Sequence, residues 1–313
     1  MSRTPDLGCA VLSLAGDPRL VGAVRSLQAQ AEPVEVVVVN SGGGEPAARL
    51  RAAGIDVPVI DHPDRLFPGG ARNLAIAATG APYLAYLAAD CRAEPGWIAA
   101  RLRAHRAGAA AVAGVMSNPF PESRIASASH LLLYLRRLAH TEPTTRLLYG
   151  LSYDRRLFER YGGFREDLRM GEDTDFNRRF QKHATVAWAP DVRTAHMYPT
   201  RFRDFLPDQY RRGRLQALAF ERIGEPKAAR LARRAVGDVP LCMETAWRAA
   251  DPQERRSLLR SWPLLVPGAL MLAAGALSHL VRPAAAATLE RPRTARLAGT
   301  TEARTTAPEM PSP

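Results

Sequence analysis

The sequence predicts an α/β protein in which one sheet carries most of the polar motifs. Short apolar runs alternate with stretches of helical spacing over residues 9–115. The apolar runs end in loops that contain Gly, Asn or Asp. This alternation is typical of successive βαβ units around a parallel sheet. The chain has 313 residues and no internal repeat, which suits one large domain with an appendage.

The first half of the chain supplies the expected sheet and its covering helices. Residues 34–39 are almost continuously β-branched, as in a strand buried on both faces. Pro and Gly residues punctuate the other runs and place the turns. Strands are expected at residues 9–14, 34–39, 57–60, 83–87 and 109–115, and helices at residues 20–28, 46–53, 71–78 and 97–106.

The second half is less regular. Residues 118–150 show weak periodicity, with a helix expected at 130–138. A helix follows the acidic residues near position 172, and a strand is expected at 185–189. After Arg201 the pattern is mostly helical. We therefore expect a catalytic-type domain over residues 1–215 and a helical extension over residues 216–260.

Residues 261–281 form a stretch without Asp, Glu, Lys or Arg, about as long as a bilayer requires. Two prolines, a serine and a histidine within it weaken this signal. A membrane span or buried hairpin and a soluble packing helix are both compatible with the pattern. Residues 282–313 are dominated by Ala, Thr, Pro and Arg, which predicts a disordered tail.

The amino-acid composition limits the classes of binding partner that we expect. The formal net charge is +12, and Lys182 and Lys227 are the only lysines among 43 basic residues. Such a chain attracts nucleotides or acidic lipids. No basic block has the interleaved aromatics of RNA binders, so no nucleic-acid partner is expected. The cysteines at positions 9, 91 and 242 form no Cys-x-x-Cys pair, and residues 1–8 lack an apolar signal core. We expect a reducing, cytoplasmic location without disulfides.

Two loops could bind a nucleotide diphosphate. Asn40 and Ser41 end a predicted strand, at the edge where α/β proteins usually bind ligands. Gly69 and Gly70 precede Arg72 at a predicted helix start, which favours anions. Each loop alone also fits an ordinary turn.

Acidic residues and one histidine supply the remaining chemistry. Asp90 follows a strand and could hold a divalent cation, to which His196 could add a nitrogen ligand. Glu172 and Asp173 lie in a Gly-Glu-Asp-Thr-Asp run, where one acid could deprotonate a hydroxyl. Each of these has a structural alternative. Asp90 could belong to an ordinary turn, the acids of the Gly-Glu-Asp-Thr-Asp run could cap a helix, and His196 could be a histidine that is hydrogen-bonded within the fold.

The order of these motifs resembles the inverting family 2 glycosyltransferases, which have the GT-A fold. The resemblance covers roughly residues 8–215. Its strongest parts are Gly70-Ala71-Arg72-Asn73, residues 83–90, Tyr161-Gly162-Gly163-Phe164 and Gly171-Glu172-Asp173.

The resemblance implies roles for these residues. Asn40 would contact the nucleotide base, and Arg72 would lie near the base and phosphates. Asp90 matches the last acid of the Asp-x-Asp metal motif, and His196 lies where some relatives have a further ligand. Asp173 matches the catalytic base, with Glu172 beside it. The implied substrates are a nucleotide-sugar donor and a saccharide acceptor. If residues 261–281 lie in a membrane, we expect a lipid-linked or cell-envelope acceptor, used at the inner face of the cell membrane.

One residue departs from the family pattern. Ala88 stands where the motif commonly has its first Asp. Use of Mn²⁺ or Mg²⁺ is therefore open, and a catalytically weak nucleotide-sugar-binding protein is the alternative function. A nucleotidyltransferase fits poorly, because residues 14–17 make a poor glycine-rich loop. Residues 118–149 are expected to shape the acceptor site, with Arg124, Arg136 and Arg137 facing either an anionic acceptor or solvent.

Overall fold

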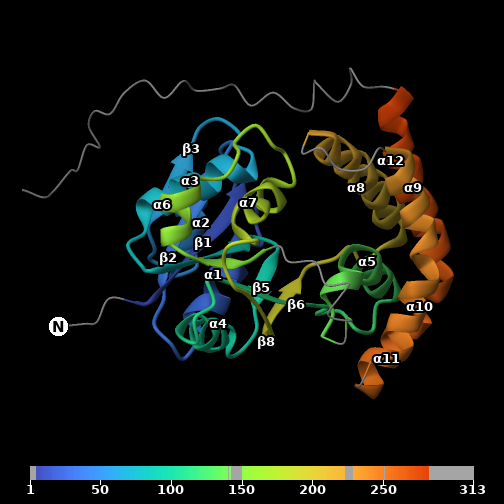
Figure 1. Cartoon of the computed structure of the whole chain (residues 1–313), viewed down its shortest axis with the longest axis horizontal. Coiled ribbons are helices and arrows are strands. Elements are labelled where there is room, and N and C mark those ends of the chain that lie inside the picture. Colours follow the sequence, from blue (N-terminus) through green and yellow to red (C-terminus); the bar gives the residue numbers. More distant parts are fainter. Residues whose placement is uncertain (1–4, 140, 142–149, 223–227, 250, 282–313) are drawn as a thin grey trace, which may run out of the picture.

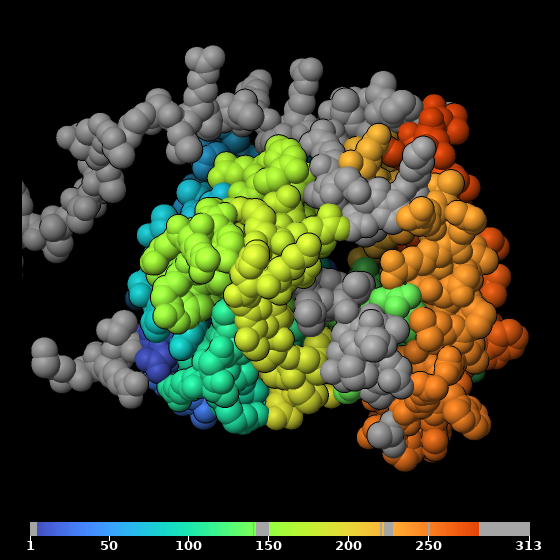
Figure 2. Space-filling model, viewed as in Figure 1, coloured from blue at the N-terminus to red at the C-terminus, as the bar shows by residue number. Residues whose placement is uncertain are grey.

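A computed structural model describes residues 5–139, 141, 150–222, 228–249 and 251–281. An α/β part, blue to yellow-green in Figure 1, holds the sheet. The C-terminal helices, orange to red, lie together at its side. The space-filling view shows these helices as a continuous block beside the α/β part (Figure 2).

Eight strands form one mixed sheet in the order β3-β2-β1-β4-β7-β6-β8-β5. Strands β1–β4, β6 and β8 run in one direction, while β5 and β7 run antiparallel to their neighbours. The bounds are β1 Leu7–Leu14, β2 Glu35–Ser41, β3 Val59–His62, β4 Tyr83–Ala88, β5 Cys91–Ala93, β6 Ala111–Ser117, β7 Ser152–Asp154 and β8 Val186–His196.

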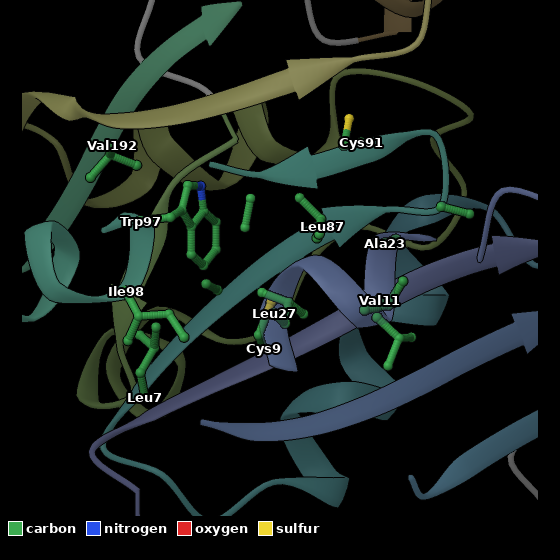
Figure 3. Close-up of a cluster of buried hydrophobic side chains, with 14 of the residues drawn as sticks. Leu7, Cys9, Val11, Ala23, Leu27, Leu87, Cys91, Trp97, Ile98 and Val192 are labelled. Carbon is green, nitrogen blue, oxygen red and sulfur yellow. The ribbon is translucent and has the colours of Figure 1, made fainter. Parts of the chain in front are cut away.

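Helices cover both faces of this sheet. The bounds in the α/β part are α1 Leu20–Gln28, α2 Pro46–Ala52, α3 Pro68–Ala78, α4 Trp97–Arg106, α6 Arg156–Tyr161 and α7 Glu172–Phe180. Side chains of α1 and α4 pack in one core, and those of α3, α6 and α7 in another. Helix α5 Arg124–Tyr134 and the 3-10 helix η1 Leu135–Arg137 instead pack with the C-terminal helices in a third core (Figure 1). Successive residues of β1 enter alternate cores, since Cys9 lies in the first and Ala10 in the second. Trp97 and Ile98 lie near Leu7 and Cys9 in the first core (Figure 3).

The fold confirms the predicted α/β architecture and refines several elements. Two strands were missed, because β5 and β7 have only three residues each. Helix α5 begins at Arg124, earlier than the expected residue 130, because Ser123 caps it by accepting a hydrogen bond from the Ala126 N–H. Strand β8 continues through Pro190 to His196, well beyond the expected residue 189.

The C-terminal part is helical, as predicted. Its helices are α8 Phe202–Arg222, α9 Ala228–Gly237, α10 Val239–Trp247, α11 Pro252–Arg260 and α12 Trp262–Val281. Within the described ranges, α12 alone is long and apolar enough to cross a membrane, by length and composition. One of its faces packs against α8, α9 and α5. The predicted tail, residues 282–313, lies outside the described residues.

Candidate active site

The candidate site lies at one edge of the sheet. Because six strands run in the same direction, their carboxyl ends meet there. Asn40 and Ser41 end β2, Asp90 follows β4, and His196 ends β8. Helix α3, with Gly69, Gly70 and Arg72 in its first turns, begins shortly after β3. The sheet thus brings most of the predicted site residues to one edge, where open α/β sheets bind ligands.

Arg72 joins this edge to the acidic end of α7. The Arg72 guanidinium lies 2.9 Å from the Glu172 carboxylate and 3.9 Å from that of Asp173. It also lies 5.1 Å from the ring centres of both Tyr86 and Phe164, within the range of cation–π attraction. Arg72 is therefore fixed by two acids and two rings.

The local backbone explains why α7 can present both acids. Gly171 precedes the helix with a φ of 87°, a conformation that favours glycine. Asp173 accepts hydrogen bonds from the Gly150 N–H at 3.2 Å and the Thr174 N–H at 2.8 Å. Its side chain is 14% exposed, against 5% for Glu172. Asp173 is thus oriented and partly accessible, whereas Glu172 is enclosed.

Burial changes the ionisation of this cluster. Loss of solvent raises the pKa of Glu172, and the Asp173 charge raises it further, while Arg72 opposes both. For Arg72, burial lowers the pKa, but the two carboxylates outweigh burial and raise it overall. A permanently charged arginine between two acids suits a site that must hold one acid as a base.

Asn73 joins the Gly70–Asn73 motif to the Tyr161–Phe164 motif, a role that the sequence alone did not indicate. Asn73 accepts a hydrogen bond from the Phe164 N–H at 2.8 Å and donates one to the Phe164 carbonyl at 2.9 Å. Gly69 meets the same loop, because a Cβ there would lie 2.0 Å from the Arg165 carbonyl oxygen. Gly69 thus serves a close backbone contact. The Gly70–Asn73 and Tyr161–Phe164 motifs therefore pack on each other, which is a physical reason for both to occur in one chain.

Asn40 is fully buried, and its amide is occupied by protein groups. Its Oδ1 accepts from the Gly16 N–H at 3.0 Å, and its Nδ2 donates to the Gly43 carbonyl at 2.8 Å and to Asp61 at 2.7 Å. The structure gives Asn40 a positioning role, and its contact with a base stays a prediction. Asp61, which accepts a hydrogen bond from Asn40, is exposed. The sequence did not indicate it as a site residue.

Asp90 and His196 come together although they are distant in sequence. Antiparallel pairing of β5 with β8 places His196 opposite Cys91, beside Asp90. The Asp90 Oδ2 and His196 Nε2 lie 3.6 Å apart. Ligand atoms about 2.1 Å from one ion lie roughly 3.0–3.6 Å apart, so this spacing fits a shared cation.

The surroundings of His196 support the same interpretation. Burial lowers its pKa to about 4 although Asp90 raises it, so the ring is neutral and able to bind a metal near pH 7. Its Nδ1 has no hydrogen-bond partner within the described part of the chain. The Tyr134 and Tyr198 rings flank it, with centres 5.5 and 4.6 Å away. Cys91 is also near, but burial raises its pKa and keeps it a thiol.

A basic pocket of about 560 Å³ opens beside this pair. Arginines from three segments line it: Arg19 before α1, Arg92 in β5, and Arg211 and Arg212 in α8. Three aspartates line it as well, and one of them, Asp208, pairs with both α8 arginines. The Arg92 side chain donates to the Ala89 and Cys91 carbonyls, which wraps it around the Asp90 turn. Sequence reasoning missed these arginines because they belong to no shared motif.

The basic residues predicted for an acceptor site are placed differently. Arg137 is buried and donates to the Gly114 carbonyl at 2.7 Å, so the expectation that it faces solvent was wrong. Its contact with an anionic acceptor stays a prediction. Arg136 lies 3.4 Å from Asp238, and Arg124 is exposed. Residues 140 and 142–149 of the predicted acceptor segment lie outside the described residues.

Comparison with known proteins identifies the class. Residues 16–164 match the model of glycosyl transferase family 2. Over 205 residues the chain is 26% identical to the pre-mycofactocin glycosyltransferase of two Mycobacterium tuberculosis strains, CDC 1551 and H37Rv. That match covers 61% of this chain but 42% of the relative, so the chain spans less than half of those proteins.

A solved structure bears out the fold. The mannosyltransferase PcManGT from Pyrobaculum calidifontis, in complex with GDP-Man and Mn²⁺, superposes with a TM-score of 0.51 at 19% identity. The alignment covers 92% of this chain and 79% of that one. This confirms the predicted GT-A fold of the α/β part, of which residues 16–164 are similar to glycosyl transferase family 2.

Proposed function

We propose that the protein is an inverting glycosyltransferase in which Asp173 is the general base. As the acceptor oxygen bonds to the anomeric carbon, Asp173 takes the hydroxyl proton. The bond to the diphosphate oxygen breaks on the opposite face, and its electron pair leaves with the nucleoside diphosphate. The main support is the Arg72–Glu172–Asp173 cluster, which leaves one oriented carboxylate partly exposed at the ligand-binding edge.

The donor diphosphate is proposed to bind beside Asp90 and His196. Mn²⁺ or Mg²⁺ held by these two residues would neutralise charge on the leaving group. Arg19, 3.7 Å from Asp90, and Arg92 add positive charge at the same place. These arginines offset the weaker metal binding expected from Ala88. The Gly69–Arg72 turn and the Asn40–Asp61 pair complete the donor side.

The acceptor is proposed to be a saccharide or a lipid-linked glycan of the cell envelope. The basic pocket beside Asp90 would receive its anionic or phosphate-bearing part. An enzyme with such an acceptor would work at the inner face of the cell membrane, which also suits the net charge of +12.

Donor identification tests this proposal. The full-length protein is screened for thermal stabilisation by nucleotides and nucleotide sugars, with and without Mn²⁺. Products from the stabilising donor are then followed by NMR, and the first-formed anomer should be opposite in configuration to the donor. A product with retained configuration would contradict the proposed single displacement.

The alternative is a catalytically weak protein that still binds nucleotide sugars. The observation favouring it is Ala88, which places a methyl group at the exposed end of β4. Stabilisation by a donor with no transfer or hydrolysis in Mn²⁺ or Mg²⁺ would support this alternative. Turnover with inversion would exclude it.

A further inference from the structure

We propose that α12 is an in-plane membrane anchor, with its exposed apolar stripe in the headgroup region of an anionic bilayer. The stripe consists of Trp262, Val266, Leu270, Leu277 and Val281. This inference rests on the proposed membrane location. It does not rest on the transfer reaction, so vesicle binding tests it separately from catalysis.

The stripe contains five of the ten large apolar residues that are exposed among the described residues. Leu270 is 52% exposed, Trp262 60% and Val281 80%. The spacing of four or seven residues places the stripe along one side of the helix. Large exposed apolar stretches mark contact surfaces, and a tryptophan at the end of such a helix suits the membrane interface.

The opposite side of α12 is closed against α8. A Cβ at Gly275 would lie 2.0 Å from the Tyr210 carbonyl oxygen, and one at Gly213 would lie 1.9 Å from that of Leu272. His279 and Glu221 add a contact of 2.6 Å between the two helices. These backbone approaches hold α12 on α8 as one unit.

This packing argues against a transmembrane orientation. A spanning α12 would carry α8 into hydrocarbon with it. Helix α8 contains several charged residues: Asp204, Asp208, Arg211, Arg212 and Arg214. Charges at the bilayer centre are costly, so α12 lies along the surface, with α8 on the aqueous side.

Charge favours a lipid partner over a second copy of the chain. Three exposed or half-buried arginines precede the stripe on α11: Arg255, Arg256 and Arg260. Arginines beside an apolar helix face attract anionic headgroups. A second copy would bring an equal net charge of +12 to the contact, which opposes its approach.

The placement also connects the membrane to the active site. Asp204, Asp208, Arg211 and Arg212 of α8 line the basic pocket, whereas Tyr210 and Gly213 face α12. Helix α8 therefore contacts both the anchor and the pocket. Docking through α12 would hold the pocket near the headgroups.

Vesicle flotation provides the test. Full-length protein is mixed with phosphatidylcholine vesicles, with or without phosphatidylglycerol, and should float with the anionic ones. Leu270→Glu/Leu277→Glu should lower partitioning at least about tenfold, because two apolar contacts become charged. The matched control Ala48→Glu/Ala52→Glu adds the same charges to exposed positions of α2 and should bind like wild type. Equal binding by both double variants, or no binding by wild type, overturns the proposal.

Depth measurement separates an in-plane helix from a span. Spin labels on Val266→Cys, Leu270→Cys and Leu277→Cys should report similar shallow depths. The three native cysteines are buried and stay unlabelled in the folded protein. A spanning helix would separate the outer two labels by up to about 16 Å along the bilayer normal, which would overturn the in-plane orientation. Dimers that dissociate in the Glu variants, without vesicle binding, would assign the stripe to a second copy and overturn the lipid partner.

Discussion

The Arg72–Glu172–Asp173 cluster and the Asp90–His196 pair lie at the same sheet edge but differ in completeness. In the first, an arginine meets two acids and two aromatic rings. In the second, the carboxylate and imidazole stay 3.6 Å apart, beyond hydrogen-bond distance. The first is preorganised by the chain itself. The second has the form of a site that a ligand completes.

The largest expected effect comes from opening the complete cluster. Arg72→Met leaves two acids near each other without their cation, one of them buried. Breaking a buried ion pair typically costs about 3–5 kcal/mol, and urea unfolding should show a loss of that size. The control is Arg103→Met, whose pair with Asp191 is exposed and should cost at most about 1 kcal/mol. Equal losses would contradict a special role for the Arg72 cluster.

A pH series examines the same cluster through Glu172. Burial raises its pKa from the ordinary 4.5 to about 7, so between these values the folded state holds more protons than the unfolded state. Glu172 then reduces stability as pH rises through this window, by at most about 1.4 kcal/mol per pH unit. Unfolding curves should show this decline for wild type relative to Glu172→Gln. Parallel pH profiles for the two proteins would refute the raised pKa.

Gly69→Ala tests the contact between the start of α3 and the loop that contains Phe164 and Arg165. The new Cβ would meet the Arg165 carbonyl oxygen, and relief of that overlap should cost about 1–3 kcal/mol in thermal or urea unfolding. Gly80→Ala serves as control, because a Cβ at Gly80 would meet no atom within 4 Å beyond its chain neighbours. The control should change stability by no more than about 1 kcal/mol. If neither substitution changed the stability, the loop that contains Arg165 would move aside at little cost.

The smallest effect concerns the incomplete pair. Mn²⁺ at ten times its Kd should stabilise wild type by about 1.4 kcal/mol, and EDTA should reverse this. Asp90→Asn or His196→Gln should lose the stabilisation, because each removes one ligand. Asp204→Asn removes an exposed carboxylate of the same pocket and should keep it. Stabilisation that survives in all three variants would place the ion elsewhere.

The sequence predicted the sheet well because its strands are encoded locally. The β-branched run near residues 34–39 becomes the buried strand β2, and the acids near position 172 begin α7. Strands β5 and β7 are too short to show a period, so only the tertiary pairing defines them. Local pattern therefore predicted the frame of the fold and missed its short closing strands.

The prediction of site residues likewise succeeded where a local motif marks the residue and failed where contacts distant in sequence decide its role. Motif order predicted that Arg72, Asp90, Asp173 and His196 belong to one site, and the structure places them along the same sheet edge. The burial of Asn40 and the inward direction of Arg137 depend on neighbours distant in sequence. The pocket arginines come from α8, from β5 and from the residue before α1, and no local pattern joins them.

Replacement of the proposed base tests the central claim most directly. Asp173→Asn should lower the transfer rate by about 10²–10⁴-fold while donor affinity stays near wild type. Asp175→Asn, two residues further along α7 and ion-paired with Arg165 and Arg179, should transfer sugar at nearly the wild-type rate. Wild-type-like transfer by Asp173→Asn would contradict the account, as would equal losses in both variants.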